Sequence, residues 1–131
     1  LAAGVRALVV PTRRAAPLGA TAFKAAAGAL EQVRVAAVSS VAAAVGQLAR
    51  LGVWTVGLAA DGDRSLFGLP LLEEPVALVV GSEGRGLGRL VKARVSVRAR
   101  IPLAGPVESL NASVAAALAL YELARARRWV G

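Results

Sequence analysis

Short apolar runs alternate with amphipathic stretches along the whole chain. Five segments rich in Val, Leu and Ala predict strands, at residues 5–10, 33–38, 53–59, 76–80 and 95–101. The last of them alternates apolar and polar residues with a period of two, whereas 76–80 is apolar throughout and suits the centre of a parallel sheet. Apolar residues at helical spacing predict helices at 20–32, from Ser39 or Ser40 to about 51, at 86–93 and at 110–128.

Alternating strands and helices predict an α/β fold, with a mostly parallel sheet and helices on both faces. Residues 60–75 contain Asp, Gly, Pro and Glu and predict a surface loop. We find no internal repeat and no linker, so the 131 residues are expected to form one domain.

The composition excludes several classes of protein. Hydrophobic residues make up 56% of the chain, too many for a disordered protein. The longest apolar run lies between Asn111 and Glu122, too short for a membrane span of roughly 18 residues or more. The first residues do not have the pattern of a signal peptide, so we expect a cytoplasmic protein without a membrane partner.

The chain contains neither Cys nor His. A disulfide framework is therefore impossible within it, and the usual zinc and haem ligands are absent, so no metal is expected. Ser-His-Asp and Cys-His catalysis are excluded within the chain for the same reason.

The net charge of +8, from 16 basic and 8 acidic residues, favours polyanionic partners and nucleic acid first. Six basic residues without an acid among them follow one another in the second half of the chain, at Arg85, Arg89, Lys92, Arg94, Arg98 and Arg100. Such a run is often only a solvated face. Here it adjoins the loops described next, so contact with RNA or DNA stays open on charge alone.

Three loops rich in Gly, Pro or Ser follow apolar segments between residues 81 and 113. They are the glycine loop 81–86, the Ile-Pro-Leu-Ala-Gly-Pro loop 101–106, and the Glu-Ser-Leu-Asn-Ala-Ser segment 108–113 that opens the last helix. In α/β sheets, ligands bind at the carboxyl ends of the strands, where such loops lie. We therefore expect the ligand here.

The glycine loop fits neither familiar phosphate-binding pattern. Gly81 and Gly86 have the spacing of a triphosphate loop, but Leu87 stands where Lys is required. The dinucleotide pattern fails because Arg89 occupies the third glycine position. An acid in the loop, Glu83, would repel a phosphate and suits a cationic or hydroxyl-bearing ligand, although simple turn glycines remain an alternative.

The other two loops offer mainly backbone groups and amide chemistry. The loop 101–106 has no polar side chain, so only its backbone can read the edge of a purine. In the third loop, Asn111 can both donate and accept hydrogen bonds, which suits a ribose or a carboxylate. The alternative for Asn111, as for Ser109, is an ordinary helix cap.

Together the three loops resemble the SpoU (TrmH-like) family of S-adenosylmethionine-dependent RNA 2′-O-ribose methyltransferases, which belong to the trefoil-knotted (SPOUT) superfamily. The matching stretches are Val-Gly-Ser-Glu-Gly-Arg-Gly-Leu at 80–87, Ile-Pro-Leu-Ala-Gly at 101–105, Val-Glu-Ser-Leu-Asn-Ala-Ser-Val-Ala at 107–115 and Leu-Tyr-Glu at 120–122. Upstream, residues 11–16 and 24–30 resemble the branch that modifies ribosomal-RNA guanosine. The resemblance covers nearly the whole chain.

The resemblance implies a C-terminal trefoil knot, a rare exception to the rule against knotted chains. It implies that S-adenosylmethionine is held by the loop residues and a strand end, at Leu58, Ala59, Gly81, Ile101, Leu103 and Leu110. The catalytic residues would be Glu83, Ser109 and Asn111. RNA contacts are expected at Arg13, Arg14, Arg85 and Arg89. The implied substrate is guanosine of 23S ribosomal RNA, with transfer RNA as the alternative.

The last helix predicts a partner chain. Its apolar residues form two stripes, one of Leu110, Val114, Leu118 and Tyr121 and the other of Ala116, Leu120 and Leu123. A helix that is apolar nearly all round must be covered on several sides. One side can pack on the sheet and the other predicts a homodimer, as the resemblance also implies.

One family motif has no counterpart. The family's first motif, Asn-x-Gly-x-x-x-Arg-x-Ala, precedes a strand equivalent to 5–10, but this chain starts where the motif should just have ended. We therefore expect a truncation at Leu1 that also removes a small N-terminal RNA-binding domain, and a chain that binds cofactor with little turnover. A non-catalytic RNA-binding or dimerisation module on the same fold is the competing hypothesis.

Overall fold

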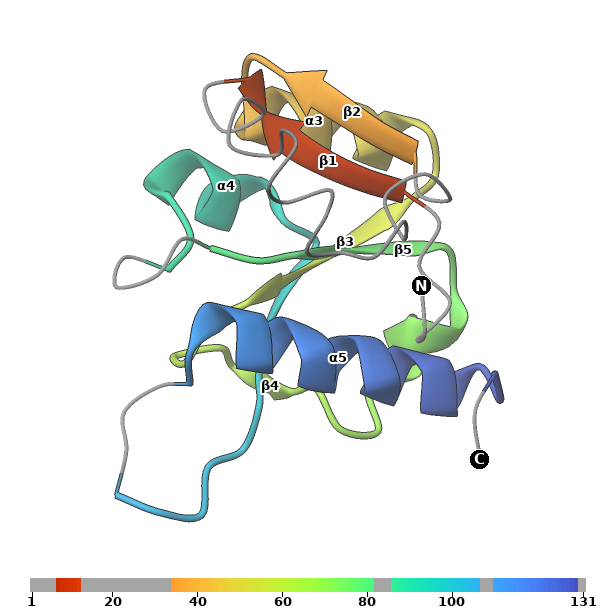
Figure 1. Cartoon of the computed structure of the whole chain (residues 1–131). Helices are drawn as coiled ribbons and strands as arrows, with labels where there is room; N and C mark the ends of the chain where they lie inside the picture. Colours follow the sequence, from red (N-terminus) through yellow and green to blue (C-terminus); the bar gives the residue numbers. More distant parts are fainter. Residues whose placement is uncertain (1–6, 13–33, 82–85, 107–109, 130–131) are drawn as a thin grey trace, which may run out of the picture.

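The computed structural model describes residues 7–12, 34–81, 86–106 and 110–129 (Figure 1). The strands are β1 (Ala7–Pro11), β2 (Arg34–Val38), β3 (Trp54–Leu58), β4 (Arg64–Ser65), β5 (Val76–Val79) and β6 (Val97–Arg100). The helices are α3 (Val41–Arg50), α4 (Arg89–Arg94), α5 (Ala112–Ala126) and the 3₁₀ helix η3 (Pro70–Glu73).

Every strand pairing among the described residues is parallel. β1 pairs with β2, and the other strands form a four-stranded sheet in the order β4-β6-β3-β5. In Figure 1, α3 and α4 lie on one side of β3 and β5, and α5 crosses the other side. The predicted α/β fold with a mostly parallel sheet and helices on both faces is therefore confirmed. The trefoil knot stays a prediction, and the expected helix at 20–32 lies outside the described residues.

Local sequence explains where α3 begins and ends. The side chain of Ser40 accepts a hydrogen bond from the backbone N–H of Ala43 at 3.1 Å, which satisfies one of the unpaired donors of the first turn. Ala42 and Val45 are buried on its inner face. Past its last turn, Gly52 adopts a φ of 81°, a backbone conformation that favours glycine.

The two faces of β3 meet different partners. Val56 and Leu58 belong to the main core, with Ala99 of β6 and with Ala119 and Leu123 of α5. On the other face, the hydroxyls of Thr55 and Ser96 each accept a hydrogen bond from the other residue's N–H, both at 2.9 Å. This reciprocal pair fixes the starts of β3 and β6 side by side.

The prediction of a surface loop at 60–75 was wrong. The segment contains β4 and η3, and its leucines Leu66, Leu69 and Leu72 are buried in the core. They recur every third residue, and the backbone N–H of each of the last two bonds to the carbonyl of the preceding one at 3.1 Å. Because a 3₁₀ turn has three residues, these three leucine side chains point to the same side, toward the core. Gly68 and Pro70 between the leucines, and the Asp and Glu residues on either side of them, concealed this pattern.

The position predicted for the most apolar strand was also wrong. In the described four-stranded sheet, β5 is at an edge and β3 and β6 are inside. All four residues of β5 are nevertheless partly buried, because η3 packs beside the strand. The residues of β5 are therefore all apolar because neighbouring elements bury the strand, and not because it lies at the centre of the sheet.

Candidate functional site

A cleft of about 540 Å³ opens at the carboxyl ends of β3, β5 and β6. Its size is within the usual range of small-molecule sites, roughly 300–1,000 Å³. The structure brings all six residues predicted to contact the cofactor into its lining: Leu58, Ala59, Gly81, Ile101, Leu103 and Leu110. They come from four separate segments, so the fold assembles what the sequence spreads over more than fifty residues. Their contact with a cofactor stays a prediction.

Most of the wall is apolar, and its polar groups are few. Leu58 and Leu87 are buried, and Ile101 is half-buried beside them. Asp61, Lys92 and Asn111 are the charged or amide side chains in the lining. An apolar wall with a small number of placed polar groups is the usual design of a small-molecule site.

Gly81 shapes the cleft through the absence of a side chain. A β-carbon at this position would overlap the carbonyl group of Gly86 and lie 2.5 Å from the amide nitrogen of Leu87. Only glycine lets the end of β5 pass so close to the backbone that leads into α4. Gly81 and the Gly86–Leu87 backbone therefore both line the cleft.

Asn111 lies in the cleft lining but its side chain also caps α5. Its Oδ1 accepts from the N–H of Ser113 at 2.9 Å and from that of Val114 at 3.4 Å. The Ser113 hydroxyl lies 2.5 Å from the same oxygen. The cap interpretation of Asn111 is thus realised, and a role toward a ribose stays a prediction.

Of the remaining predicted site residues, Arg89 alone lies within the described part of the chain. Glu83, Arg85, Ser109, Arg13 and Arg14 lie outside the described residues. Arg89 is exposed at the start of α4 and lines a separate, neighbouring hollow.

Sequence reasoning missed Asp61 and Lys92 as cleft residues. Asp61 comes three positions after β3, so the rule that ligands meet the carboxyl ends of strands would have found it. Lys92 had been noted only as one of several basic residues. Within the described residues, no group of three or more His, Cys, Asp or Glu side chains could hold a metal ion, and no helix is long and apolar enough to cross a membrane.

The sequence pattern of the SpoU rRNA Methylase family matches residues 1–121. The chain belongs to this family. Its resemblance to SpoU enzymes, first indicated by the three loops, is thereby confirmed. The arrangement of the loops around one cleft agrees with a family whose members share this fold.

Individual SpoU relatives align along nearly the whole chain. The 23S rRNA (guanosine-2′-O-)-methyltransferase RlmB of Pseudomonas aeruginosa is 43% identical over 126 residues, covering 96% of this chain and 50% of that protein. The putative TrmH family tRNA/rRNA methyltransferase YacO of Bacillus subtilis is 44% identical over 133 residues, covering 99% and 52%. The chain thus spans about half the length of these relatives.

Solved structures of SpoU enzymes have the same fold. The SpoU methyltransferase AviRb from Streptomyces viridochromogenes, in complex with the cofactor AdoMet, superimposes with a TM-score of 0.85 at 28% identity. The superposition covers 98% of this chain and 53% of the AviRb chain.

Proposed function

We propose that this chain is the cofactor-binding part of an S-adenosylmethionine-dependent RNA 2′-O-ribose methyltransferase that modifies guanosine in 23S ribosomal RNA. The observation that carries the proposal is the single cleft formed by the end of β3 and the loops after β5 and β6. The name of the Pseudomonas relative supports the reaction and the substrate. The AdoMet complex of AviRb supports the cofactor.

The residues of the cleft fit S-adenosylmethionine. The apolar walls from Leu58, Leu87 and Ile101 suit the flat adenine, and the exposed backbone beside Gly81 offers donors and acceptors for its edge. When bound, S-adenosylmethionine supplies an activated methyl group for transfer.

The protein's part in such a reaction is alignment and proton removal. A ribose 2′-oxygen would have to lie in line with the methyl carbon and the sulfur that carries it. As the C–O bond forms, the sulfur–methyl bond would break, the sulfur would leave as a neutral thioether, and the hydroxyl proton would have to be removed. The chain has no His or Cys, so we assign Glu83 or solvent to take the proton and Ser109 and Asn111 to orient the ribose. The family's first-motif Arg would assist, and that motif is absent from these residues.

RNA and a second copy of the chain are the proposed partners. The net charge of +8 supports RNA binding, for which we propose Arg13, Arg14, Arg85 and Arg89. The outer stripe of α5 supports a homodimer, because Val114, Leu118 and Tyr121 are 48%, 43% and 48% exposed.

Two measurements on the same chain test the function. Calorimetry with S-adenosylmethionine should give one site per chain. Transfer of a tritiated methyl group to 23S ribosomal RNA, followed by nucleoside digestion, should yield 2′-O-methylguanosine. A longer chain that carries the family's first motif should transfer the methyl group faster than these 131 residues do.

The competing hypotheses have distinct results. RNA binding without cofactor binding would identify a non-catalytic RNA-binding or dimerisation module and refute the proposal. Methylation of transfer RNA in preference to ribosomal RNA would correct the substrate, an alternative that the name of the Bacillus relative supports.

A further inference from the structure

A second hollow adjoins the cleft and is lined mainly by cations. Its lining consists of Leu87, Arg89, Lys92, Ala93 and Arg98. We call it the cationic hollow. It shares Leu87 and Lys92 with the cleft, so the two sites are separated by no more than these side chains.

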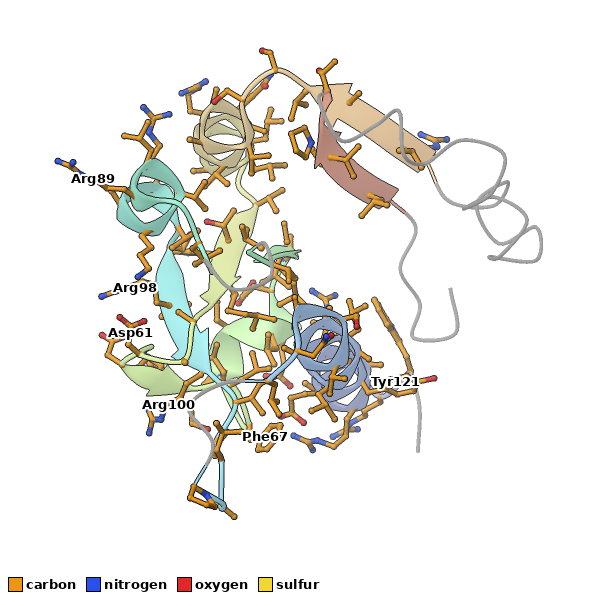
Figure 2. All side chains as sticks on the ribbon, turned by 60° about the vertical axis from the view of Figure 1, so that its left-hand side comes forward. Asp61, Phe67, Arg89, Arg98, Arg100 and Tyr121 are labelled. Carbon is orange, nitrogen blue, oxygen red and sulfur yellow. The ribbon has the colours of Figure 1, made fainter. Side chains whose placement is uncertain are left out.

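The cations of the hollow come from two elements that the fold places together. Arg89 and Lys92 lie one turn apart on α4, and Arg98 lies on β6. Figure 2 shows Arg89, Arg98 and Asp61 along the same side of the molecule, with Tyr121 of α5 on the opposite side. The hollow is therefore separate from the proposed dimer stripe.

Asp61 holds two of these cations in loose ion pairs. Its Oδ2 lies 3.8 Å from Lys92 Nζ and 3.8 Å from Arg98 Nη1. The Asp61 side chain is 67% exposed and those of the two cations are 38% exposed. Long, solvated pairs of this kind contribute little to stability and are readily exchanged for another anion.

The backbone keeps the carboxylate in this place. A β-carbon on Gly62 would lie 2.7 Å from the carbonyl carbon of Ala99, so the loop that carries Asp61 rests directly on β6. Arg100 Nη1 donates to the carbonyl oxygen of Gly62 at 3.1 Å. Because these contacts do not involve the Asp61 side chain, removing its charge should leave the loop where it is.

We propose that the cationic hollow binds a backbone phosphate of RNA next to the ribose held at the cleft, and that Asp61 is the counter-charge which this phosphate displaces. The inference rests on the proposed function, since the phosphate is that of the methylated strand. Its basis is the juxtaposition of three cations, one loosely held anion and the shared wall of the cleft. According to this proposal, Asp61 lowers the affinity for RNA, whereas a residue that contacts RNA directly would raise it.

The test measures binding of a fluorescein-labelled, single-stranded RNA 20-mer by anisotropy at several KCl concentrations. Arg98→Gln should weaken binding about fivefold at roughly 0.1 M salt and reduce the salt slope by about 0.7, the value for one lost contact on a single strand. Asp61→Asn should strengthen binding about threefold, as expected for one unit charge at roughly 6 Å in water. Arg50→Gln, an equal charge change at the end of α3, is the matched control and should weaken binding less than twofold.

The proposal is overturned if Arg98→Gln behaves like Arg50→Gln, or if Asp61→Asn weakens RNA binding. If circular dichroism shows that Arg98→Gln does not fold, two other variants test the proposal. Arg98→Lys should keep most of the RNA affinity, and Asp61→Asn should still raise it. Calorimetry with S-adenosylmethionine on the unsubstituted chain separates the two hypotheses. Absent cofactor binding would refute the proposed function, and with it the assignment of the phosphate to a methylated strand, even if the RNA affinities change as expected. Unchanged RNA affinities beside normal cofactor binding would refute the hollow alone.

Discussion

Gly81 lies directly against Gly86: a β-carbon on the first would overlap the carbonyl group of the second. Gly86 itself has a φ of 63°, which favours glycine. The two glycines thus let the backbone at the end of β5 lie in contact with the backbone that leads into α4. This close contact forms one wall of the proposed cofactor cleft.

Gly81→Ala should therefore weaken both cofactor binding and the stability of the fold. The new methyl group must push the backbone of Gly86 and Leu87 away, and a shift near 1 Å at the cleft wall should lower affinity at least about tenfold. We expect overpacking to cost about 1–3 kcal/mol in the free energy of unfolding. Calorimetry with S-adenosylmethionine and urea unfolding measure the two effects.

Gly88→Ala is the matched control for that substitution. Gly88 has a φ of −66°, and no atom lies within 4 Å of a β-carbon built there. The same added methyl group should leave cofactor affinity unchanged. Equal affinities for the Gly81 and Gly88 variants would contradict the role of the close contact.

Glu122 joins α5 to the segment before η3. It is only 8% exposed, accepts a hydrogen bond from the N–H of Gly68 at 2.8 Å, and is held by Arg125 through contacts of 2.7 and 2.9 Å. Glu122→Gln removes the charge that strengthens these bonds and should lower the free energy of unfolding at pH 7 by about 1.5–3 kcal/mol. Glu73→Gln, at an exposed position of η3, should change it little. Urea unfolding of the two variants makes the comparison, and equal stabilities would refute it.

The same carboxylate predicts how stability depends on pH. The hydrogen bond from Arg125 lowers the pKa of Glu122 from its ordinary value of 4.5; burial opposes this, and the Gly68 N–H reinforces it. Because the pKa is lower in the folded chain, the contribution is fully present above about pH 4.5 and is lost as the pH falls through the lowered value. The stability difference between the parent chain and Glu122→Gln should therefore shrink between pH 5 and about pH 3. A difference that stays constant over this range would exclude the carboxylate as its cause.

Periodicity was sufficient to predict most of the fold, because each strand and helix carries its own apolar pattern. It failed at residues 60–75, where Leu66, Leu69 and Leu72 follow the three-residue period of a 3₁₀ turn between polar residues. It also failed to place β5 in the sheet. An apolar strand must be buried, but it can be buried by helices and loops at an edge of the sheet as well as by strands on both sides. Pairing order is set by contacts between distant segments, which a local pattern does not contain.

The place of the site was predictable, whereas its chemistry was only partly so. The rule on strand ends located the cleft, and six predicted residues line it. Asn111 shows the limit, since one oxygen that caps a helix and one that orients a ribose look the same in a sequence. Lys92 lies on α4 and reaches the cleft through the packing of that helix, which spacing alone does not reveal.

The hydrogen bonds between the Thr55 and Ser96 hydroxyls and backbones should stabilise the pairing of β3 with β6. Thr55 is fully buried, and its Oγ1 accepts from the Ser96 N–H at 2.9 Å. Thr55→Val keeps the shape and removes the hydroxyl's hydrogen bond, but the Ser96 N–H still donates to the Thr55 backbone carbonyl at 2.9 Å. We therefore expect a loss of about 0.5–1.5 kcal/mol in the free energy of unfolding. Thr55→Ser retains the hydroxyl and should lose less. Urea unfolding decides, and a valine variant as stable as the serine one would contradict the argument.

The outer stripe of α5 predicts the oligomeric state. Ala119, Leu123 and Ala124 are buried against the rest of the chain, whereas Leu118 and Tyr121 are about half exposed. In a symmetric dimer each copy contributes the same stripe, so one substitution alters the interface twice. Leu118→Glu should place two like charges in an apolar contact and weaken the dimer at least about a hundredfold, measured by light scattering across micromolar concentrations. Leu90→Glu adds the same charge at a 61% exposed position on α4 and should leave the mass unchanged. If the parent chain is already monomeric at these concentrations, the stripe does not serve as a dimer surface in this chain.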